Sequence, residues 1–174
     1  SGKTKSHFAI LDKQATLEEL GAFQDYDELL AALEKHQPAL VAIDAPLCLP
    51  QGLCCLEEGC SCVLYQGRKG RVSEMELAGM GIGCFYTTKR SIIKRLIYRG
   101  VWLRKNLINR GYKVIEVYPY ATKVLLFGDQ VPAKKNPACL PFLRERMGTL
   151  INGLDPHVSD LNHNRCDALL TAYT

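Results

Sequence analysis

The chain has 174 residues, of which 47% are hydrophobic and 23% are charged, and its formal net charge at pH 7 is +4. This composition is typical of one globular domain with an ordinary core and excludes a disordered or fibrous chain. No segment approaches the roughly 18 uninterrupted apolar residues that a membrane span requires, so no association with a membrane is expected. The chain begins at Ser1 without an initiator Met, and we expect it to be trimmed at its front edge.

The first elements predicted along the chain are two short strands, at 6–13 and 16–23, although the leucines of the second could also start a helix. A helix is expected over 25–37, because Asp25 is a suitable N-cap, Glu28 completes a capping box, and leucines recur on one face. The apolar run that follows, at 39–44, predicts a strand buried on both faces.

Residues 48–86 are irregular and rich in Gly and Cys, which predicts an insertion or a long functional loop. A helix is expected over 88–111, interrupted by Gly100, and a second buried strand over 113–119. The last helix is predicted to begin near His163. Two buried strands joined by a helical crossover should be parallel neighbours in a mixed sheet, so their carboxyl ends would share one edge.

Three carboxylates fall at this predicted edge. Asp44 ends the first buried strand, Glu116 lies near the end of the second, and Asp167 stands at the start of the last helix. Such ligands suit Mg²⁺ or Mn²⁺, and water bound to the metal can hydrolyse phosphate esters. Each acid also has a structural alternative: Asp44 caps the loop, Glu116 pairs with a Lys, or Asp167 caps the helix. His163 is either a general acid or base for this site or a helix cap.

The motifs around these residues resemble a known family. The segments "VAIDAPLCLP", "EVYPYATK" and "HNRCDALLTAYT" are similar to successive motifs of domain-of-unknown-function family 429, predicted nucleases with a ribonuclease-H-like fold. The similarity covers nearly the whole chain. It implies a mixed five-stranded sheet flanked by helices, in a single domain 1–174 with a Cys-rich insertion at about 48–86. It also implies a divalent metal for phosphodiester hydrolysis, held by an acidic cluster in which Asp44, Glu116 and Asp167 would be ligands.

The sequence departs from this family at two points. The family usually carries an Asp on its first strand in a G-x-D-x-S-G setting, and because Ser1 and Gly2 begin this chain, the matching Asp would lie upstream. The family's last motif often has an Asp after the His, whereas Asn164 follows His163 here and brings an oxygen but no charge. Both departures favour the alternative function, a noncatalytic nucleic-acid-binding or regulatory module with a degenerate site.

Four of the eight cysteines crowd into the segment "CCLEEGCSC". Cys54, Cys55, Cys60 and Cys62 predict a site for Zn²⁺ or for an iron–sulfur cluster. The alternatives are a loop with reduced thiols, or disulfides. Because no signal peptide is visible, we expect a reducing, cytoplasmic compartment rather than a secreted disulfide scaffold.

Basic residues concentrate between positions 89 and 110. Arg90, Lys94 and Arg95 are candidates for binding substrate phosphates, and the candidates for stacking on bases are Tyr86, Tyr98 and Trp102. This pattern predicts a nucleic acid as the partner. One alternative is a solvated helix face, which is commonly rich in Lys and Arg. Another is that Arg90 and Lys94 bind an anionic group near the carboxylates.

Overall fold

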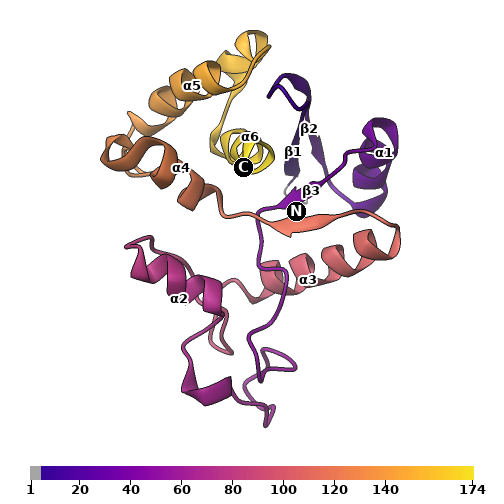
Figure 1. Cartoon of the computed structure of the whole chain (residues 1–174), viewed down its shortest axis with the longest axis vertical. Helices are drawn as coiled ribbons and strands as arrows, with labels where there is room; N and C mark the ends of the chain where they lie inside the picture. The colour runs from indigo at the N-terminus through magenta and orange to yellow at the C-terminus, as the bar shows by residue number, and fades with distance from the viewer. Residues whose placement is uncertain (1–4) are drawn as a thin grey trace. The chain divides into compact units, whose positions relative to one another are not determined.

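The computed structural model describes residues 5–174, which form four strands and six α-helices. In chain order these are β1 (Ser6–Leu11), β2 (Leu17–Phe23), α1 (Tyr26–His36), β3 (Val41–Ile43), α2 (Val72–Gly79), α3 (Lys94–Asn109), β4 (Val114–Glu116), α4 (Pro119–Phe127), α5 (Cys139–Leu150) and α6 (His163–Tyr173) (Figure 1). Short 3-10 helices follow the same order at η1 (Tyr65–Gly67), η2 (Gly128–Gln130) and η3 (Asp155–Asp160). Ser1 and Gly2, on which the family pattern would have to be matched, lie outside the described residues.

The chain divides into two compact units. The first contains Ser1–Asp44 and Val117–Thr174, and the second contains Ala45–Glu116. The predicted Cys-rich insertion therefore lies inside the second unit, together with α2, α3 and β4. In the part of the chain that the structure describes, every helix is too short or too polar to cross a bilayer.

A hairpin and a capped helix open the first unit. The Asp12 carboxylate accepts hydrogen bonds from the backbone N–H groups of Gln14 and Thr16, both at 2.8 Å, and this turn sends β2 back along β1 in an antiparallel pair. The segment 16–23 is therefore a strand rather than a helix. In α1 the side chain of Asp25 accepts from the backbone N–H of Glu28 at 3.0 Å, which confirms the predicted N-cap.

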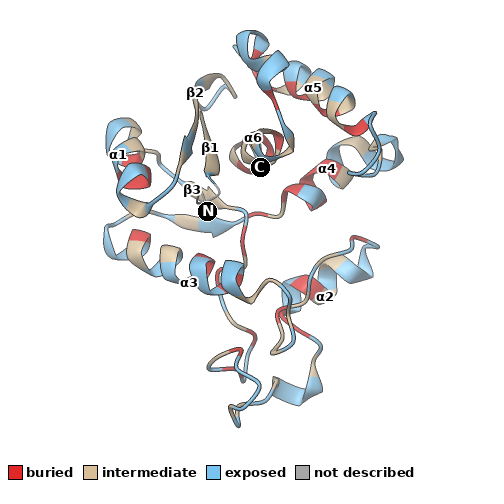
Figure 2. Cartoon of the chain, turned by 180° about the vertical axis from the view of Figure 1, so that it is seen from behind, coloured by how far each residue is buried: buried red, intermediate tan, exposed pale blue. Residues whose placement is uncertain are grey.

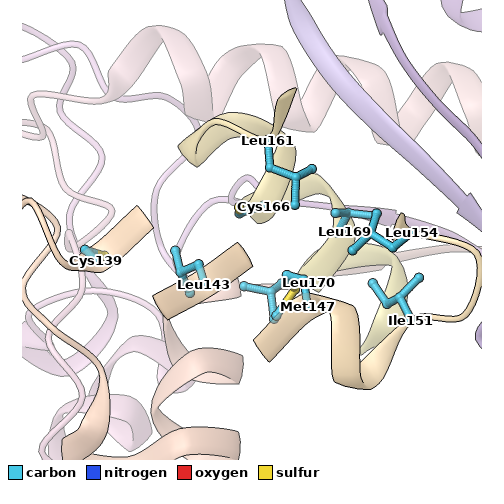
Figure 3. Packing of buried hydrophobic residues seen from close by; sticks show 9 residues of the cluster. All are labelled: Cys139, Leu143, Met147, Ile151, Leu154, Leu161, Cys166, Leu169 and Leu170. Atoms are coloured by element: carbon cyan, nitrogen blue, oxygen red, sulfur yellow. The ribbon is translucent and has the colours of Figure 1, made fainter. Parts of the chain in front are cut away.

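Buried side chains of α5 and α6 form the core of the first unit (Figure 3). Leu143 and Met147 of α5 meet Leu169 and Leu170 of α6, and none of the four is measurably exposed. Figure 2 shows buried, half-buried and exposed residues alternating along α5. Half-buried leucines of β1 and β2 also pack against this cluster, so the hairpin and the last helix share one core.

The predicted five-stranded ribonuclease-H-like sheet is wrong. Residues 5–174 supply four strands, in two separate two-stranded sheets, β1–β2 and β3–β4. The strands β3 and β4 have three residues each, and no residue of either is buried. Pro46 and Pro119 follow them closely and cannot donate a backbone hydrogen bond to a ladder. The two apolar segments that predicted long, buried strands therefore form short strands that are partly exposed.

Helix α3 runs without a break through Gly100, where an interruption was predicted. Gly100 is buried, and a Cβ at this position would lie 2.5 Å from the carbonyl oxygen of Pro46. The glycine therefore allows close packing of the helix against the chain that follows Ala45. The helix begins at Lys94 rather than at 88, so Lys89 and Arg90 precede it.

Candidate metal centre

Four cysteines of the second unit gather at one point. The Sγ atoms of Cys54, Cys55, Cys60 and Cys62 all lie within 4.8 Å of one another, and those of Cys54 and Cys60 are 3.6 Å apart. A metal ion needs several His, Cys, Asp or Glu ligand atoms close together, and among residues 5–174 these four cysteines meet that condition. All four are free cysteines. The structure therefore brings together the four residues that the sequence singled out, without disulfides.

A closed loop holds the four thiols together. At its base the backbone N–H of Tyr65 donates to the carbonyl of Gln51 at 2.9 Å, and at its tip the N–H of Cys60 donates to the carbonyl of Glu57 at 3.2 Å. Gly52 has φ +93, and a Cβ there would lie 2.3 Å from the carbonyl oxygen of Val63. Only glycine fits this crossing, because it tolerates both the positive φ and the close backbone contact.

The loop is fastened to α3 by polar contacts and by a small apolar core. The backbone N–H of Leu56 donates to the hydroxyl of Tyr98 at 2.7 Å, and this hydroxyl donates to Glu57 Oε1 at 3.0 Å. Lys89 Nζ donates to the carbonyl of Cys60. Leu53, Leu56 and Ile97 form the buried cluster beneath the loop. Tyr98 thus anchors the cysteine loop through its hydroxyl, and the stacking of its ring on a base stays a prediction.

The thiols differ in how readily they ionise. Hydrogen bonding to Cys60 raises the pKa of the Cys54 thiol to about 12, whereas backbone hydrogen bonds to Cys55 and Cys54 lower the pKa of the Cys62 thiol to about 6. Near neutral pH the Cys62 side chain is therefore ionised, whereas that of Cys54 keeps its proton. Because a bound metal needs thiolates, its binding would release protons and tighten as the pH rises.

A second polar group of this unit was missed by sequence reasoning. Arg71 Nε donates to Glu74 Oε1 at 2.7 Å, while its two terminal nitrogens donate to the carboxylate of Glu116 at 2.5 and 2.7 Å. Glu74 also accepts from the backbone N–H of Thr87 at 2.9 Å and from its hydroxyl at 2.5 Å. Both Arg71 and Glu74 are buried. The only available signal was the spacing of Arg71 and Glu74, three residues apart at the start of α2.

The Arg71 contact decides what Glu116 does in this structure. Both carboxylate oxygens of Glu116 are engaged, since Oε2 also accepts from the backbone N–H of Leu47 at 2.8 Å. The structural alternative for Glu116 was a pair with a Lys, and the partner is an Arg instead. A metal ion at Glu116 would have to compete with a bidentate guanidinium, which is among the stronger partners of a carboxylate.

Asp167 also lies beside cations. Its Oδ1 accepts from Lys123 Nζ at 2.8 Å and its Oδ2 from Lys134 Nζ at 3.4 Å; the side chain of Lys123 is 8% exposed. Asp167 does not cap α6, because Asn162 is the N-cap and accepts from the backbone N–H of Arg165 at 2.9 Å. The residue that sequence reasoning missed here is Lys123, in the quoted motif "EVYPYATK".

His163 is the first residue of α6, and its Nδ1 is buried without a hydrogen-bond partner among the described residues. Asp44 directly follows β3, at the point where the chain passes from the first unit into the second. Within residues 5–174, no group arranged to hold a metal ion includes Asp44, Glu116 or Asp167. Their roles with Mg²⁺ or Mn²⁺, and the catalytic role of His163, stay predictions.

The three candidate phosphate-binding residues lie at the start of α3. Arg90 and Arg95 are exposed, and Lys94, the first residue of the helix, is half-buried. All the charged residues around them are basic, because no Asp or Glu occurs between Glu76 and Glu116. The basic residues of that stretch are Lys89, Arg90, Lys94, Arg95, Arg99, Arg104, Lys105, Arg110 and Lys113.

Comparisons of the chain with protein-family models, with curated proteins and with solved structures find no match. Membership of family 429 and the nuclease activity it implies therefore stay predictions. What the chain does has to be inferred from the contacts of its own residues.

Proposed function

We propose that residues 45–116 form a metal-binding unit in which Cys54, Cys55, Cys60 and Cys62 hold one zinc ion. The gathering of their four Sγ atoms within 4.8 Å carries this proposal. Sulfur atoms around a tetrahedral zinc, with Zn–S bonds of about 2.3 Å, lie roughly 3.8 Å apart. The distance of 3.6 Å between the Sγ atoms of Cys54 and Cys60 is close to that value.

The same spacing favours a single ion over an iron–sulfur cluster. A polynuclear cluster binds its cysteines through several iron atoms, which keeps ligand sulfurs on different irons far from one another. Here all four Sγ atoms lie near one centre. Four protein ligands would leave no open position on zinc, so the ion has a structural role rather than a catalytic one.

Zinc would stabilise the cysteine loop, which has little buried apolar surface beneath it. The buried apolar cluster under the loop contains only Leu53, Leu56 and Ile97 within the described residues. Small folds with so little buried apolar surface are commonly completed by a structural metal. We infer that the ion holds the cysteine loop in the conformation that Tyr98 and Lys89 bind.

Cobalt substitution tests this proposal on the full-length chain. Refolding with Co²⁺ is expected to load about one ion per chain and to give sulfur-to-cobalt charge-transfer bands with the intense visible bands of tetrahedral cobalt. Cys60→Ser should weaken these bands, whereas Cys48→Ser, which alters an exposed cysteine outside the group, should leave them unchanged. Weak octahedral bands, or bands that Cys60→Ser does not alter, would refute a tetrathiolate site.

A second candidate function is the binding of nucleic acid by α3. Arg95, Arg99, Trp102 and Lys105 recur at helical spacing and are all exposed, and Trp102 is 50% exposed. Cations beside an aromatic ring suit a single-stranded nucleic acid, because the cations meet phosphates and the ring stacks on a base. The absence of any acidic residue from 77 to 115 also favours this partner.

Charge reversal on α3 tests this second function. Arg95→Glu with Arg99→Glu should lower the affinity for labelled single-stranded DNA or RNA by at least about tenfold and flatten its salt dependence by roughly 0.7 per lost phosphate contact. Fluorescence anisotropy over a series of salt concentrations measures both. Lys13→Glu with Lys135→Glu changes the net charge equally at exposed positions of the first unit. Equal losses for both double variants would indicate nonspecific attraction and contradict a site on α3.

A further inference from the structure

We propose that Cys54 and Cys60 are a modification site for hydroperoxides, at which oxidation forms a Cys54–Cys60 disulfide and releases the metal. This inference rests on the proposed zinc site and adds the response of that site to an oxidant. It separates the four cysteines into a pair that reacts and a pair that remains as thiols.

The choice of this pair rests on the hydrogen bond between the sulfurs of Cys54 and Cys60. The Sγ atoms of Cys54 and Cys60 are 3.6 Å apart, and a disulfide bond of about 2.05 Å requires them to approach by roughly 1.5 Å. The Sγ of Cys62 instead lies 3.7 Å from the carbonyl oxygen of Cys55. Cys54 is exposed, so a small hydroperoxide can reach it from solvent, while Cys60 is half-buried.

The chain between the two cysteines can accommodate this movement. Glu57, Glu58 and Gly59 are all exposed and form the turn that ends at Cys60. A Cβ at Gly59 would meet no atom within 4 Å, so the turn has open space around it. The two sulfurs can therefore approach each other through a movement at the tip of the loop, while the hydrogen bond between Gln51 and Tyr65 keeps its base in place.

The reaction takes two steps and consumes one hydroperoxide. Bound to zinc, Cys54 and Cys60 would both be thiolates, because a thiol gives up its proton when it ligates a metal. The Cys54 thiolate attacks the peroxide, forming an S–O bond and breaking the O–O bond, and the alcohol leaves after it takes a proton from water. The Cys60 thiolate then attacks the Cys54 sulfur, forming the S–S bond and displacing hydroxide, which becomes water with a second proton. Each sulfur loses one electron, and the peroxide bond receives both.

The disulfide removes two of the four ligands. Cys55 and Cys62 alone cannot complete a tetrahedral zinc site, so the ion is expected to leave. Reduction by a dithiol regenerates both thiols and allows zinc to return. The loop, which contacts Tyr98 of α3 and Lys89 just before that helix, then responds reversibly to oxidation.

The test treats the zinc-loaded full-length chain with one equivalent of hydrogen peroxide. A colorimetric chelator should report about one zinc released per peroxide consumed. N-ethylmaleimide should then label Cys55 and Cys62, and tandem mass spectrometry after cleavage at Glu57 and Glu58 should find the Cys54–Cys60 disulfide. Dithiothreitol should restore zinc binding. Cys48→Ser should behave like the unaltered chain, and Cys60→Ser should trap a sulfenic acid at Cys54, detected with dimedone.

Two results would overturn the inference: a disulfide that joins another pair, or zinc that stays bound once the Cys54–Cys60 disulfide has formed. Failure of the proposed zinc site would be visible earlier, because the chain would load no zinc before peroxide is added. In that event the disulfide map of the metal-free chain still decides whether Cys54 and Cys60 are the reactive pair.

Discussion

Removal of the metal is expected to unfold residues 45–116 while the first unit stays folded. The second unit has a small apolar core under an irregular loop, whereas the first has a cluster of nine buried residues on α5, α6 and the chain between them. Zinc at 1,000 times its Kd stabilises the state that binds it by about 4 kcal/mol. For a unit of this size that corresponds to a fall of roughly 15–30 °C in Tm when the metal is removed.

Hydrogen exchange on the full-length chain, followed by mass spectrometry, would localise this effect. With a zinc chelator, amides of α3 should lose protection, while those of β1 and α6 should keep theirs. Cys60→Ser with zinc should resemble the chelated chain, and Cys48→Ser should resemble the loaded one. If the protection of α3 is the same with and without the chelator, zinc does not organise this unit.

Most parts of this structure that the sequence predicted are held by contacts between near neighbours. Asp25 caps α1 through Glu28, three residues on, and the four cysteines lie within nine positions of the chain. Such contacts follow from spacing alone, because a turn or a helix brings these residues together whatever the rest of the chain does. For this reason the residues of the candidate metal centre could be named before the structure was known.

One contact between distant residues was predicted correctly, the pairing of β3 with β4. The parts that were not predicted also depend on residues far apart in the sequence. Arg71 and Glu116 are 45 positions apart, and Lys123 and Asp167 are 44 apart. Sequence spacing does not indicate which cation will pair with a given carboxylate. For this reason Glu116 and Asp167, which were predicted to bind a metal, are found beside Arg71 and Lys123. The five-stranded sheet failed for a related reason, since an apolar run does not reveal how many residues pair with a neighbour.

Arg71→Met is expected to destabilise the second unit by about 3–5 kcal/mol, the usual cost of removing one partner of a buried ion pair. Arg71 and Glu74 have side chains that are only 9% and 3% exposed, and Arg71 also holds both oxygens of Glu116. Without the guanidinium, the Glu74 carboxylate would remain buried with Thr87 as its principal donor. Chemical denaturation of the zinc-loaded chain, with hydrogen exchange to assign the transition to residues 45–116, measures the loss.

The control is Arg90→Met, which removes an exposed arginine of the same unit and should change stability by no more than about 0.5 kcal/mol. If Arg71→Met is equally mild, the buried group contributes nothing beyond an ordinary surface contact. Glu74→Gln keeps the shape of the carboxylate and should cost less, because Arg71 retains its pair with Glu116. The ranking Arg71→Met, then Glu74→Gln, then Arg90→Met is therefore the expected result.

Acid should weaken the same group through Glu74. Burial acts to raise the pKa of Glu74, but hydrogen bonds from Thr87 and Arg71 outweigh it and hold that pKa below its ordinary value of 4.5. The charged form thus stabilises the folded unit above the unfolded pKa, and this contribution is lost as the pH falls through the lower folded pKa. Unfolding measured between pH 7 and 3 should show a smaller acid-dependent loss in Glu74→Gln than in the unaltered chain. Equal losses in both would mean that Glu74 does not carry the acid sensitivity, and that the buried pair is held by packing rather than by charge.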